Sequence, residues 1–388
     1  MTALQDELVE VPRGLKGVVV TDTALGTVRG REGFYHYRQY SAVELAERRS
    51  LEDVWHLQLE GWLPHAQERA RFAAEVAAAR HLPLDLWEAL PLVAASGDPM
   101  TGLRTAVSWL GAARGMRPVY DLTPAQRRAD AVALTAPVPT ILAALHRLAA
   151  GRDPVPPRDD LGHAANYLWM ITGQEPEAAA ARAVEQYLVL TVDHGFNAST
   201  FTARVIASTG ADVAACVVGA LGALSGPLHG GAPSRALDTL DAIGSADRID
   251  PWVRAAVESG DRIMGFGHPI YRTEDPRSRM LKGVARGLAA GRPEAERLVG
   301  FAEEVEHGVL SGLAELKPGR ELHTNVEFYA GVVMELCGLP RAMFTPTFAV
   351  ARVIGWSANV LEQALDSKII RPSSRYVGPP PPQPVPPA

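Results

Sequence analysis

The stretch from Asp193 to Leu237 reads DHGFNASTFTARVIASTGADVAACVVGALGALSGPLHGGAPSRAL, and MGFGHPIYRTEDPRSRML follows from Met264. Three histidines in this text, His194, His229 and His268, each lie beside glycine. Glycine next to a histidine indicates a sharp bend or the close approach of another group. Three such positions in one part of the chain predict loops that bring imidazoles to a single cavity.

Three interpretations of these histidines stay open at this point. Any one of them alone can be a hydrogen-bonded core residue. A shared metal is disfavoured, because metal ligands usually come at short spacing such as HxxxH, and no partner stands at such spacing beside any of the three. The third interpretation is that they serve a carbonyl substrate as hydrogen-bond donors and acid/base groups.

Outward from this stretch, the chain is dominated by helical patterns. Strand-like text occurs only within 16–40, where glycines punctuate one or two short hairpins. Low strand content and long Ala/Leu-rich periodic segments predict an all-α protein with a short N-terminal β-hairpin. Helices are expected from N-caps at Ser41, Ser50, Thr123 and Thr345, with a break at Pro137 and Pro139, and over 178–192, 211–224, 250–263, 292–316 and 345–365.

Composition excludes several classes of partner. The 388 residues are 47% hydrophobic, which is enough for a large core and two domains, and the net charge of −6 makes a nucleic-acid partner unfavourable. The sequence shows no signal peptide and no unbroken apolar run of membrane-spanning length, so no membrane partner is expected. Cys216 and Cys337 lie in apolar helical patterns, which favours free thiols in a cytoplasmic protein.

Three arginines and one glutamate complete the candidates for chemistry. Arg277, Arg352 and Arg371 suit carboxylate recognition through paired hydrogen bonds, although a solvated position is the simplest interpretation of any one of them. Arg352 stands among apolar neighbours, so it must be paired if it is buried. Glu327, between Val326 and Phe328, is either a helix-start carboxylate or a general base made more basic by an apolar surround.

Six motifs follow one another along the chain: DHGFNASTFTARV, GPLHGGAP, MGFGHPIYRTEDPR, NVEFYAG, ARVIGW and RPSSRYVGP. Together they resemble the citrate synthase family, from GLKGVVV to RYVGP. The resemblance implies an all-α, two-domain homodimer with a large domain in 1–226 and 334–376 and a small domain in 227–333. Outside the resemblance, the Pro-rich composition predicts a disordered tail in 377–388. The resemblance also implies an acyltransferase that condenses acetyl-CoA with oxaloacetate to give citrate and CoA.

The resemblance assigns roles to the candidate residues. His229 matches the histidine that donates to the thioester oxygen, His268 the one that polarises the ketone of oxaloacetate, and Glu327 the base that removes a methyl proton. The matches to substrate-binding positions are His194, Asn197, Arg277, Arg352 and Arg371, the last reaching in from the partner subunit. CoA contacts are implied for Gly230, Gly231, Met264, Gly265, Phe266, Gly267 and Arg272. No metal and no cofactor is implied, because histidines supply the electrophilic assistance.

Departures from the family pattern leave two alternatives. Glu327 stands where the family usually has Asp, and a displacement near 1 Å can cost about 10²-fold in rate. The chain could therefore be an impaired relative that binds oxaloacetate or CoA as a sensor. It could also be a 2-methylcitrate synthase that uses propionyl-CoA, because one more methylene changes specificity by only about 1–3 kcal/mol.

Overall fold

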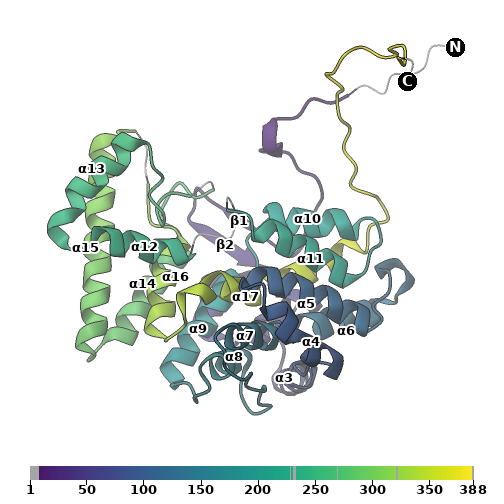
Figure 1. Cartoon of the computed structure of the whole chain (residues 1–388), viewed down its shortest axis with the longest axis horizontal. Helices are drawn as coiled ribbons and strands as arrows, with labels where there is room; N and C mark the ends of the chain where they lie inside the picture. Colours follow the sequence, from purple (N-terminus) through teal and green to yellow (C-terminus); the bar gives the residue numbers. More distant parts are fainter. Residues whose placement is uncertain (1–7, 228, 230–232, 269, 320–321, 387–388) are drawn as a thin grey trace.

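Helices make up most of the chain, which confirms the predicted all-α class (Figure 1). The computed structural model describes residues 8–227, 229, 233–268, 270–319 and 322–386. The α-helices are α1 (Ala42–Arg48), α2 (Leu51–Glu60), α3 (Ala66–Ala79), α4 (Leu84–Ala94), α5 (Pro99–Ala113), α6 (Pro124–Thr135), α7 (Val138–Ala149), α8 (His163–Thr172), α9 (Ala178–Thr191), α10 (Ala198–Ala207), α11 (Val213–Leu224), α12 (Pro233–Ile243), α13 (Ile249–Ser259), α14 (Pro276–Ala289), α15 (Pro293–Leu316), α16 (Val326–Leu336) and α17 (Phe344–Gln363). Short 3₁₀ turns are η1 (Arg13–Leu15), η2 (Val119–Asp121), η3 (Ala246–Arg248) and η4 (Arg341–Met343).

The predicted N-terminal hairpin is present as a small antiparallel sheet. Its strands β1 (Gly26–Arg29), β2 (Phe34–Tyr37) and β3 (Tyr40–Ser41) pair in the order β1-β2-β3. Tyr35 and Tyr37 are buried and alternate on β2 with the half-buried Phe34 and His36. Their hydroxyls donate to the carbonyl oxygens of Leu190 (3.0 Å) and Val189 (2.9 Å), so the hairpin is attached to the end of α9.

Most predicted helix starts are confirmed by their caps. The Ser50 hydroxyl accepts from Asp53 N, and Thr123 forms a capping box with Gln126 at the start of α6. The break between α6 and α7 falls at residues 136–137, as predicted from the prolines. The predicted cap at Thr345 is wrong: η4 runs directly into α17, which begins at Phe344 without a side-chain cap.

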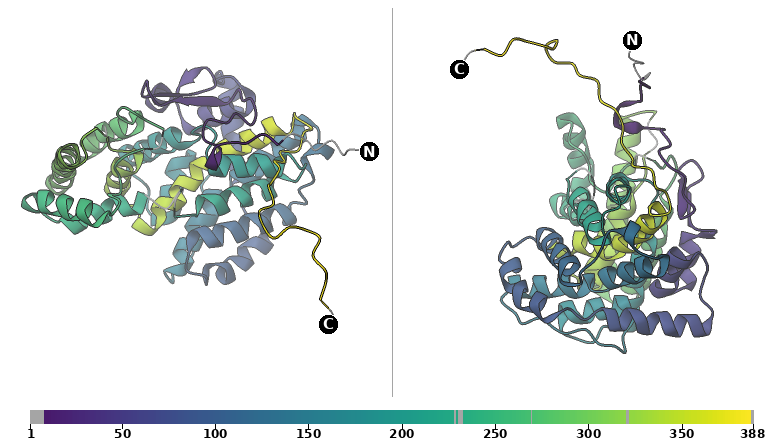
Figure 2. Two further views of the ribbon diagram at one scale, coloured as in Figure 1. Left: turned by 90° about the horizontal axis from the view of Figure 1, so that it is seen from above. Right: turned by 90° about the vertical axis from the view of Figure 1, so that its right-hand side faces the viewer.

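Helix α17 is the most buried long helix and lies at the centre of the helical body (Figures 1 and 2). It packs against α6, α9, α10 and α11. The contact with the end of α9 is very close, because a Cβ at Gly355 would lie 2.1 Å from the Val192 carbonyl oxygen. Only glycine fits there, and this contact places the loop that begins at Asp193 against α17.

Helices α12 to α16 gather at one end of the molecule, on the left in Figure 1. Within this group α14 packs on α16, and α13 packs on α15. The predicted small domain in 227–333 includes α12 to α15 and most of α16, and the division into 1–226, 227–333 and 334–376 stays a prediction. Residues 377–386 have no regular secondary structure, and disorder of the 377–388 tail also stays a prediction.

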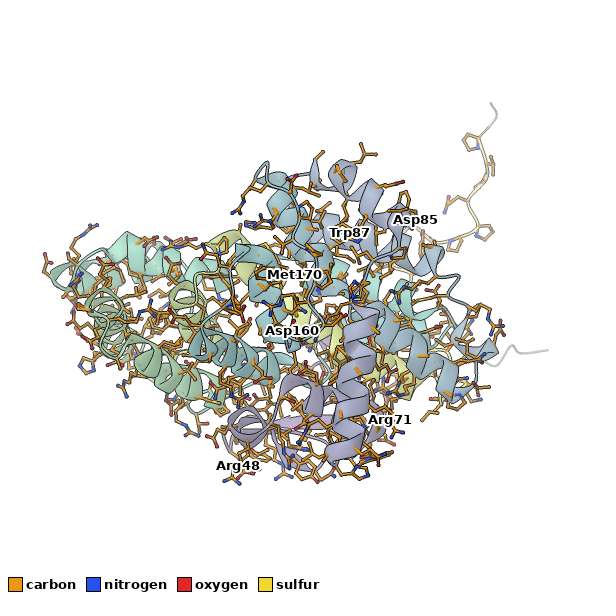
Figure 3. All side chains as sticks on the ribbon, turned by 90° about the horizontal axis from the view of Figure 1, so that it is seen from below. Arg48, Arg71, Asp85, Trp87, Asp160 and Met170 are labelled. Carbon is orange, nitrogen blue, oxygen red and sulfur yellow. The ribbon has the colours of Figure 1, made fainter. Side chains whose placement is uncertain are left out.

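The stretch Pro124–Ala149 is long and apolar enough to span a membrane, and 78% of its most apolar window is buried in the protein. It comprises α6 and α7, which pack inside the helical body as core helices do. This stretch is not an unbroken apolar run in the sequence, because Thr, Pro, His and Arg interrupt it. In Figure 3 the charged Arg48, Arg71 and Asp160 lie at the surface, whereas Met170 is buried. Both cysteines are free thiols.

Candidate active site

A cavity of about 210 Å³ lies where the α12–α16 group meets the central helices. It brings together seven of the predicted catalytic and substrate-binding residues: His194, Asn197, His229, His268, Arg277, Glu327 and Arg352. Met264 and Gly267, two of the predicted CoA contacts, also line it, as do Pro227, Arg262, Ile270, Asn325, Val326 and Phe348. Residues separated by more than 150 positions thus share one enclosed space.

His229 is oriented by the first turn of α10. Its Nε2 lies 2.8 Å from Ser199 Oγ, and Trp356 Nε1 donates to the same oxygen at 3.2 Å. Ser199 has one hydroxyl proton, and both Asn197 Oδ1 at 2.7 Å and His229 Nε2 lie within its reach. When this proton points to Asn197, His229 Nε2 is the donor to Ser199 Oγ; when it points to His229, the ring proton is on Nδ1. Burial, and then Arg352, lowers the pKa of His229 to about 4, so the ring is neutral at pH 7.

The same turn explains Asn197. This residue is the N-cap of α10, and its Oδ1 accepts from Thr200 N (3.1 Å) and from Ser199 Oγ (2.7 Å). Asn197 therefore fixes the helix start that carries Ser199, while its side chain lines the cavity. Sequence reasoning identified Asn197 as a substrate-binding residue and did not identify its capping role.

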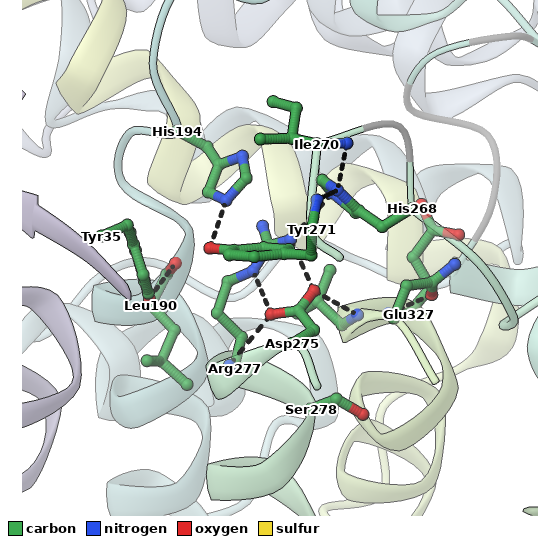
Figure 4. Close-up of polar contacts among 12 residues, drawn as sticks. Tyr35, Leu190, His194, His268, Ile270, Tyr271, Asp275, Arg277, Ser278 and Glu327 are labelled. Atoms are coloured by element: carbon green, nitrogen blue, oxygen red, sulfur yellow. Dashed lines mark hydrogen bonds and ion pairs between the residues drawn. The ribbon is translucent and has the colours of Figure 1, made fainter. Parts of the chain in front are cut away.

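His268 is held by the backbone that follows it. Its Nδ1 accepts from Ile270 N (3.1 Å) and Tyr271 N (3.2 Å), so the neutral ring carries its proton on Nε2 (Figure 4). Burial, and then Arg277, lowers the pKa of His268 to about 4. The ring can therefore act as a neutral N–H donor. Gly267, with φ of +80°, provides the turn that directs it into the cavity.

His194 lies beside His268, with 5.6 Å between ring centroids. Its Nε2 is 3.0 Å from the hydroxyl of Tyr271, and its ring packs edge-on against Tyr35 of the hairpin. Burial, and then Arg277, places the pKa of His194 well below its usual value. The hairpin and the 268–271 loop thus support a second neutral imidazole.

Glu327 stands in the first turn of α16 and is mostly buried. The helix start is capped by Asn325, whose Oδ1 accepts from Glu327 N at 3.0 Å. Within the described residues, no hydrogen bond to the Glu327 carboxylate is found, so backbone donors do not neutralise it. Burial raises the pKa of this carboxyl to about 7, whereas Arg277 and Arg262 oppose the rise. A carboxyl in this state suits a general base near neutral pH.

Two buried arginines supply positive charge. The Arg277 guanidinium donates to the Asp275 carboxylate (2.8 and 3.0 Å), and although burial lowers its pKa, that partner raises it well above the usual value. Arg352 donates from Nε to the Thr191 carbonyl oxygen at 3.0 Å and lies over the Phe348 ring. Burial lowers the pKa of Arg352, and Asp193 opposes this effect. Both arginines line the cavity, so they can bind a dicarboxylate there.

Other predicted residues lie elsewhere. Arg371 is exposed in the C-terminal segment and lines a separate groove with residues 8–21. Arg272 lines a larger hollow of about 1180 Å³ beside Leu322 and His323. The Phe266 side chain packs on Phe328 in the core, and Gly265 is buried against the same ring. Gly230 and Gly231 lie outside the described residues.

Several contributors were not found from the sequence. Ser199 and Trp356 orient His229 across 157 positions, and no local pattern connects them. Tyr271 lies within the motif MGFGHPIYRTEDPR without a role assigned to it, and Arg262 lies two residues before that motif. Asp275 had a usable signal, because Asp-Pro-Arg places an N-cap two residues before Arg277. Among the described residues, no group of three or more His, Cys, Asp or Glu is arranged to hold a metal ion.

Comparison with known proteins agrees with this geometry. Residues 14–373 match the family model described as citrate synthase, C-terminal domain. The citrate synthase of Deinococcus radiodurans is 38% identical over 95% of this chain and 96% of its own length, and a 2-methylcitrate synthase of Mycobacterium tuberculosis is 37% identical over 96% and 92%. The solved citrate synthase of Thermoplasma acidophilum, in complex with carboxymethyl coenzyme A and oxaloacetate, has a TM-score of 0.89 at 28% identity and covers 97% of this chain and 98% of its own. The chain therefore belongs to the citrate synthase family, and it is an acyltransferase that condenses acetyl-CoA with oxaloacetate to give citrate and CoA.

Proposed function

We propose that Glu327, His229 and His268 divide the chemistry of this condensation among them, while Arg277 and Arg352 hold the carboxylates of oxaloacetate. The observation that carries the proposal is their convergence on one cavity of about 210 Å³. The two imidazoles are neutral and present N–H groups, and the carboxyl is poised near neutral pH. These are the protonation states that enolisation and carbonyl polarisation require.

The first step removes a proton from the methyl group of acetyl-CoA. Glu327 takes the proton, and His229 Nδ1 donates a hydrogen bond to the thioester oxygen as negative charge develops there. A placed donor of this kind is worth roughly 2.7–4 kcal/mol of transition-state stabilisation. This role requires the Ser199 proton to point to His229 Nε2 instead of to Asn197 Oδ1, so that the ring proton is on Nδ1.

The second step forms the carbon–carbon bond. The enol carbon attacks the ketone carbon of oxaloacetate, and His268 Nε2 donates a hydrogen bond to the ketone oxygen as it becomes the alkoxide. The alkoxide gains one proton to become the hydroxyl, and the proton that Glu327 removed from the methyl group balances this gain. Water then cleaves the citryl thioester to release citrate and CoA. Arg277 and Arg352 neutralise the dicarboxylate throughout, which is effective because the cavity is buried.

The CoA moiety is proposed to extend from the cavity into the hollow of about 1180 Å³ lined by Arg272. The two spaces adjoin, since Gly267 N donates to the His323 carbonyl oxygen at 2.8 Å and both residues line their walls. Arg272 provides a cation for a phosphate group. Met264 and Gly267 line the smaller cavity next to this hollow, which supports the CoA contacts predicted for these two residues.

A homodimer is proposed as the active form, with Arg371 reaching the cavity of the partner subunit. Arg371 lies outside its own subunit's cavity. The C-terminal segment around it exposes large apolar side chains, including Ile369 and Tyr376 at 60% and 69%. Exposed apolar groups on an extended segment favour contact with another copy of the chain. Size-exclusion chromatography with light scattering measures the mass directly.

Catalysis without a metal or organic cofactor, in the cytoplasm, is also proposed. Histidine and arginine donors supply the electrophilic assistance in the scheme above. The free thiols of Cys216 and Cys337 suit a reducing compartment. Dialysis against EDTA should leave the rate unchanged, and a loss of activity restored by one metal ion would refute this part.

Propionyl-CoA is the second candidate substrate, because the Mycobacterium tuberculosis relative is named 2-methylcitrate synthase. The decisive experiment is a thiol-release assay with acetyl-CoA and propionyl-CoA, each with and without oxaloacetate. Oxaloacetate-dependent release with a higher kcat/KM for acetyl-CoA is expected. A higher value for propionyl-CoA would assign the second function, and no release with either thioester would favour a binding protein.

A further inference from the structure

Asp275 occupies a junction between two helices that carry functional residues. It is 1% exposed and is the N-cap of α14, yet its carboxylate serves more than that helix. Oδ1 accepts from Arg277 N and from Arg277 Nε, both at 3.0 Å. Oδ2 accepts from Arg277 Nη2 at 2.8 Å and from Val326 N at 3.1 Å (Figure 4). One buried carboxylate thus receives four N–H groups from α14, from a guanidinium and from α16.

The contact with Arg277 determines which donors remain for a ligand. Asp275 takes the Nε and Nη2 edge of the guanidinium in a two-point contact. The remaining N–H groups are on Nη1 and on the second position of Nη2. Nη2 lies 3.3 Å from His268 Nε2, and because that nitrogen carries the ring proton, both atoms are donors and do not bond each other. Because Arg277 lines the cavity, Asp275 presents the other edge of the guanidinium to it.

The contact with Val326 N acts on α16. Val326 is the first residue of that helix, and Glu327 is the second. Asn325 caps Glu327 N, so the first two backbone N–H groups of α16 are satisfied from different sides. The Asp275 carboxylate therefore sets the position of the turn from which the Glu327 side chain extends.

We infer that Asp275 is a positioning residue that fixes the oxaloacetate-binding guanidinium of Arg277 and the base-carrying start of α16 relative to each other. The inference rests on the proposed roles of Arg277 and Glu327. A helix cap alone would require only the bond from Arg277 N. The three further N–H groups, from a side chain and from a helix 51 positions away, are what a positioning role requires.

The pKa of Glu327 is a measurable property that distinguishes the positioning role of Asp275 from a simple helix-capping role. Asp275 is among the groups that raise the pKa of Glu327, after burial. The other charged or titratable groups around it are Arg277 on α14, Arg262 in the preceding loop, Arg352 on α17, Tyr187 on α9, and His229 and His268. Loss of the Asp275 charge therefore lowers the pKa of Glu327 and moves the acid limb of the kcat profile to lower pH.

The test compares Asp275→Asn with Asp275→Ser and with the matched control Asp212→Asn in the full-length chain. Asp212 is also an N-cap aspartate, on α11, and its carboxylate bonds only Ala215 N among the described residues. Serine can still accept a hydrogen bond from Arg277 N as an N-cap. It has no carboxylate, so the hydrogen bonds to the Arg277 guanidinium and to Val326 N are lost. Steady-state kinetics over oxaloacetate concentration and pH, and thermal melting, are measured for all three variants.

Asp275→Asn is expected to raise KM for oxaloacetate about tenfold or more and to lower kcat by a similar factor, with the acid limb displaced to lower pH. Asp275→Ser should behave in the same way, and Asp212→Asn should match the wild type. The proposal is overturned if Asp275→Asn changes KM and kcat no more than Asp212→Asn. It is also overturned if kcat falls with an unshifted limb and an unchanged KM, or if both Asp275 variants fail to fold. Absence of oxaloacetate-dependent turnover in the wild type would instead refute the proposed function.

Discussion

At the scale of single residues, Glu327 stands where the family resemblance leads one to expect Asp. The structure places the longer carboxylate in the same cavity as His229 and His268, with its pKa raised to about 7. The sequence left a choice between a helix-start carboxylate and a base. Asn325 provides the capping that a helix-start role would have required, so the carboxylate is available for proton transfer.

Removing the charge at Glu327 should abolish most turnover. Glu327→Gln is expected to lower kcat by about 10²–10⁴-fold, because the amide cannot accept the methyl proton. Glu327→Asp keeps a carboxylate and should retain more activity than the Gln variant. Thiol release under saturating substrates measures both. A Gln variant at the wild-type rate would show that another group is the base.

Among the three residues proposed for the chemistry, Glu327 is the one whose pKa lies between about pH 5 and 9. The base acts when deprotonated, so kcat should rise with pH through a pKa near 7. His229 and His268 have pKa values lowered to about 4, so both rings are already neutral there and add no second limb. A bell-shaped profile with a descending limb below pH 8 would contradict these assignments.

At the scale of elements, the sequence predicted the first residues of helices more accurately than it predicted the contacts between helices. Local capping chemistry placed Ser50 and Thr123 correctly, because a hydroxyl and the next three residues decide such a cap. The prediction of an N-cap at Thr345 was wrong, because the 3₁₀ turn η4 leads directly into α17 and already forms the first helical turn. Contacts such as Trp356 to Ser199 depend on packing between distant helices, which no local pattern encodes.

The approach of α17 to the end of α9 gives an element-scale prediction. A Cβ at position 355 would meet the Val192 carbonyl oxygen at 2.1 Å, and backbone cannot move as a side-chain tip does. Gly355→Ala should therefore destabilise the fold by about 1–3 kcal/mol and displace the His194 loop. Denaturant unfolding measures the first effect, and KM for oxaloacetate measures the second. Gly222→Ala on α11, where a Cβ meets nothing within 4 Å, is the control.

At the scale of the whole molecule, the N-terminal segment and the C-terminal segment leave the helical body on the same side (Figure 1). The C-terminal segment is held to its own subunit by Tyr120, whose hydroxyl donates to Asp366 O at 2.7 Å, and by Ile370 N, which donates to Ser208 Oγ at 3.0 Å. Beyond these contacts it is exposed and carries Arg371. The sequence alone could identify Arg371 by its motif and could not determine which subunit it serves.

Mixed dimers can determine which subunit Arg371 completes. If Arg371 serves the partner's cavity, Arg371→Ala and Glu327→Gln are each nearly inactive as pure dimers. A dimer with one subunit of each kind then holds one intact site, because the Arg371→Ala subunit keeps its Glu327 and receives Arg371 from the other. Unfolding and refolding an equal mixture should restore about a quarter of wild-type activity, since half of the dimers are mixed and one of their two sites is whole. If Arg371 serves its own cavity, every site in the mixture lacks one group and no activity returns.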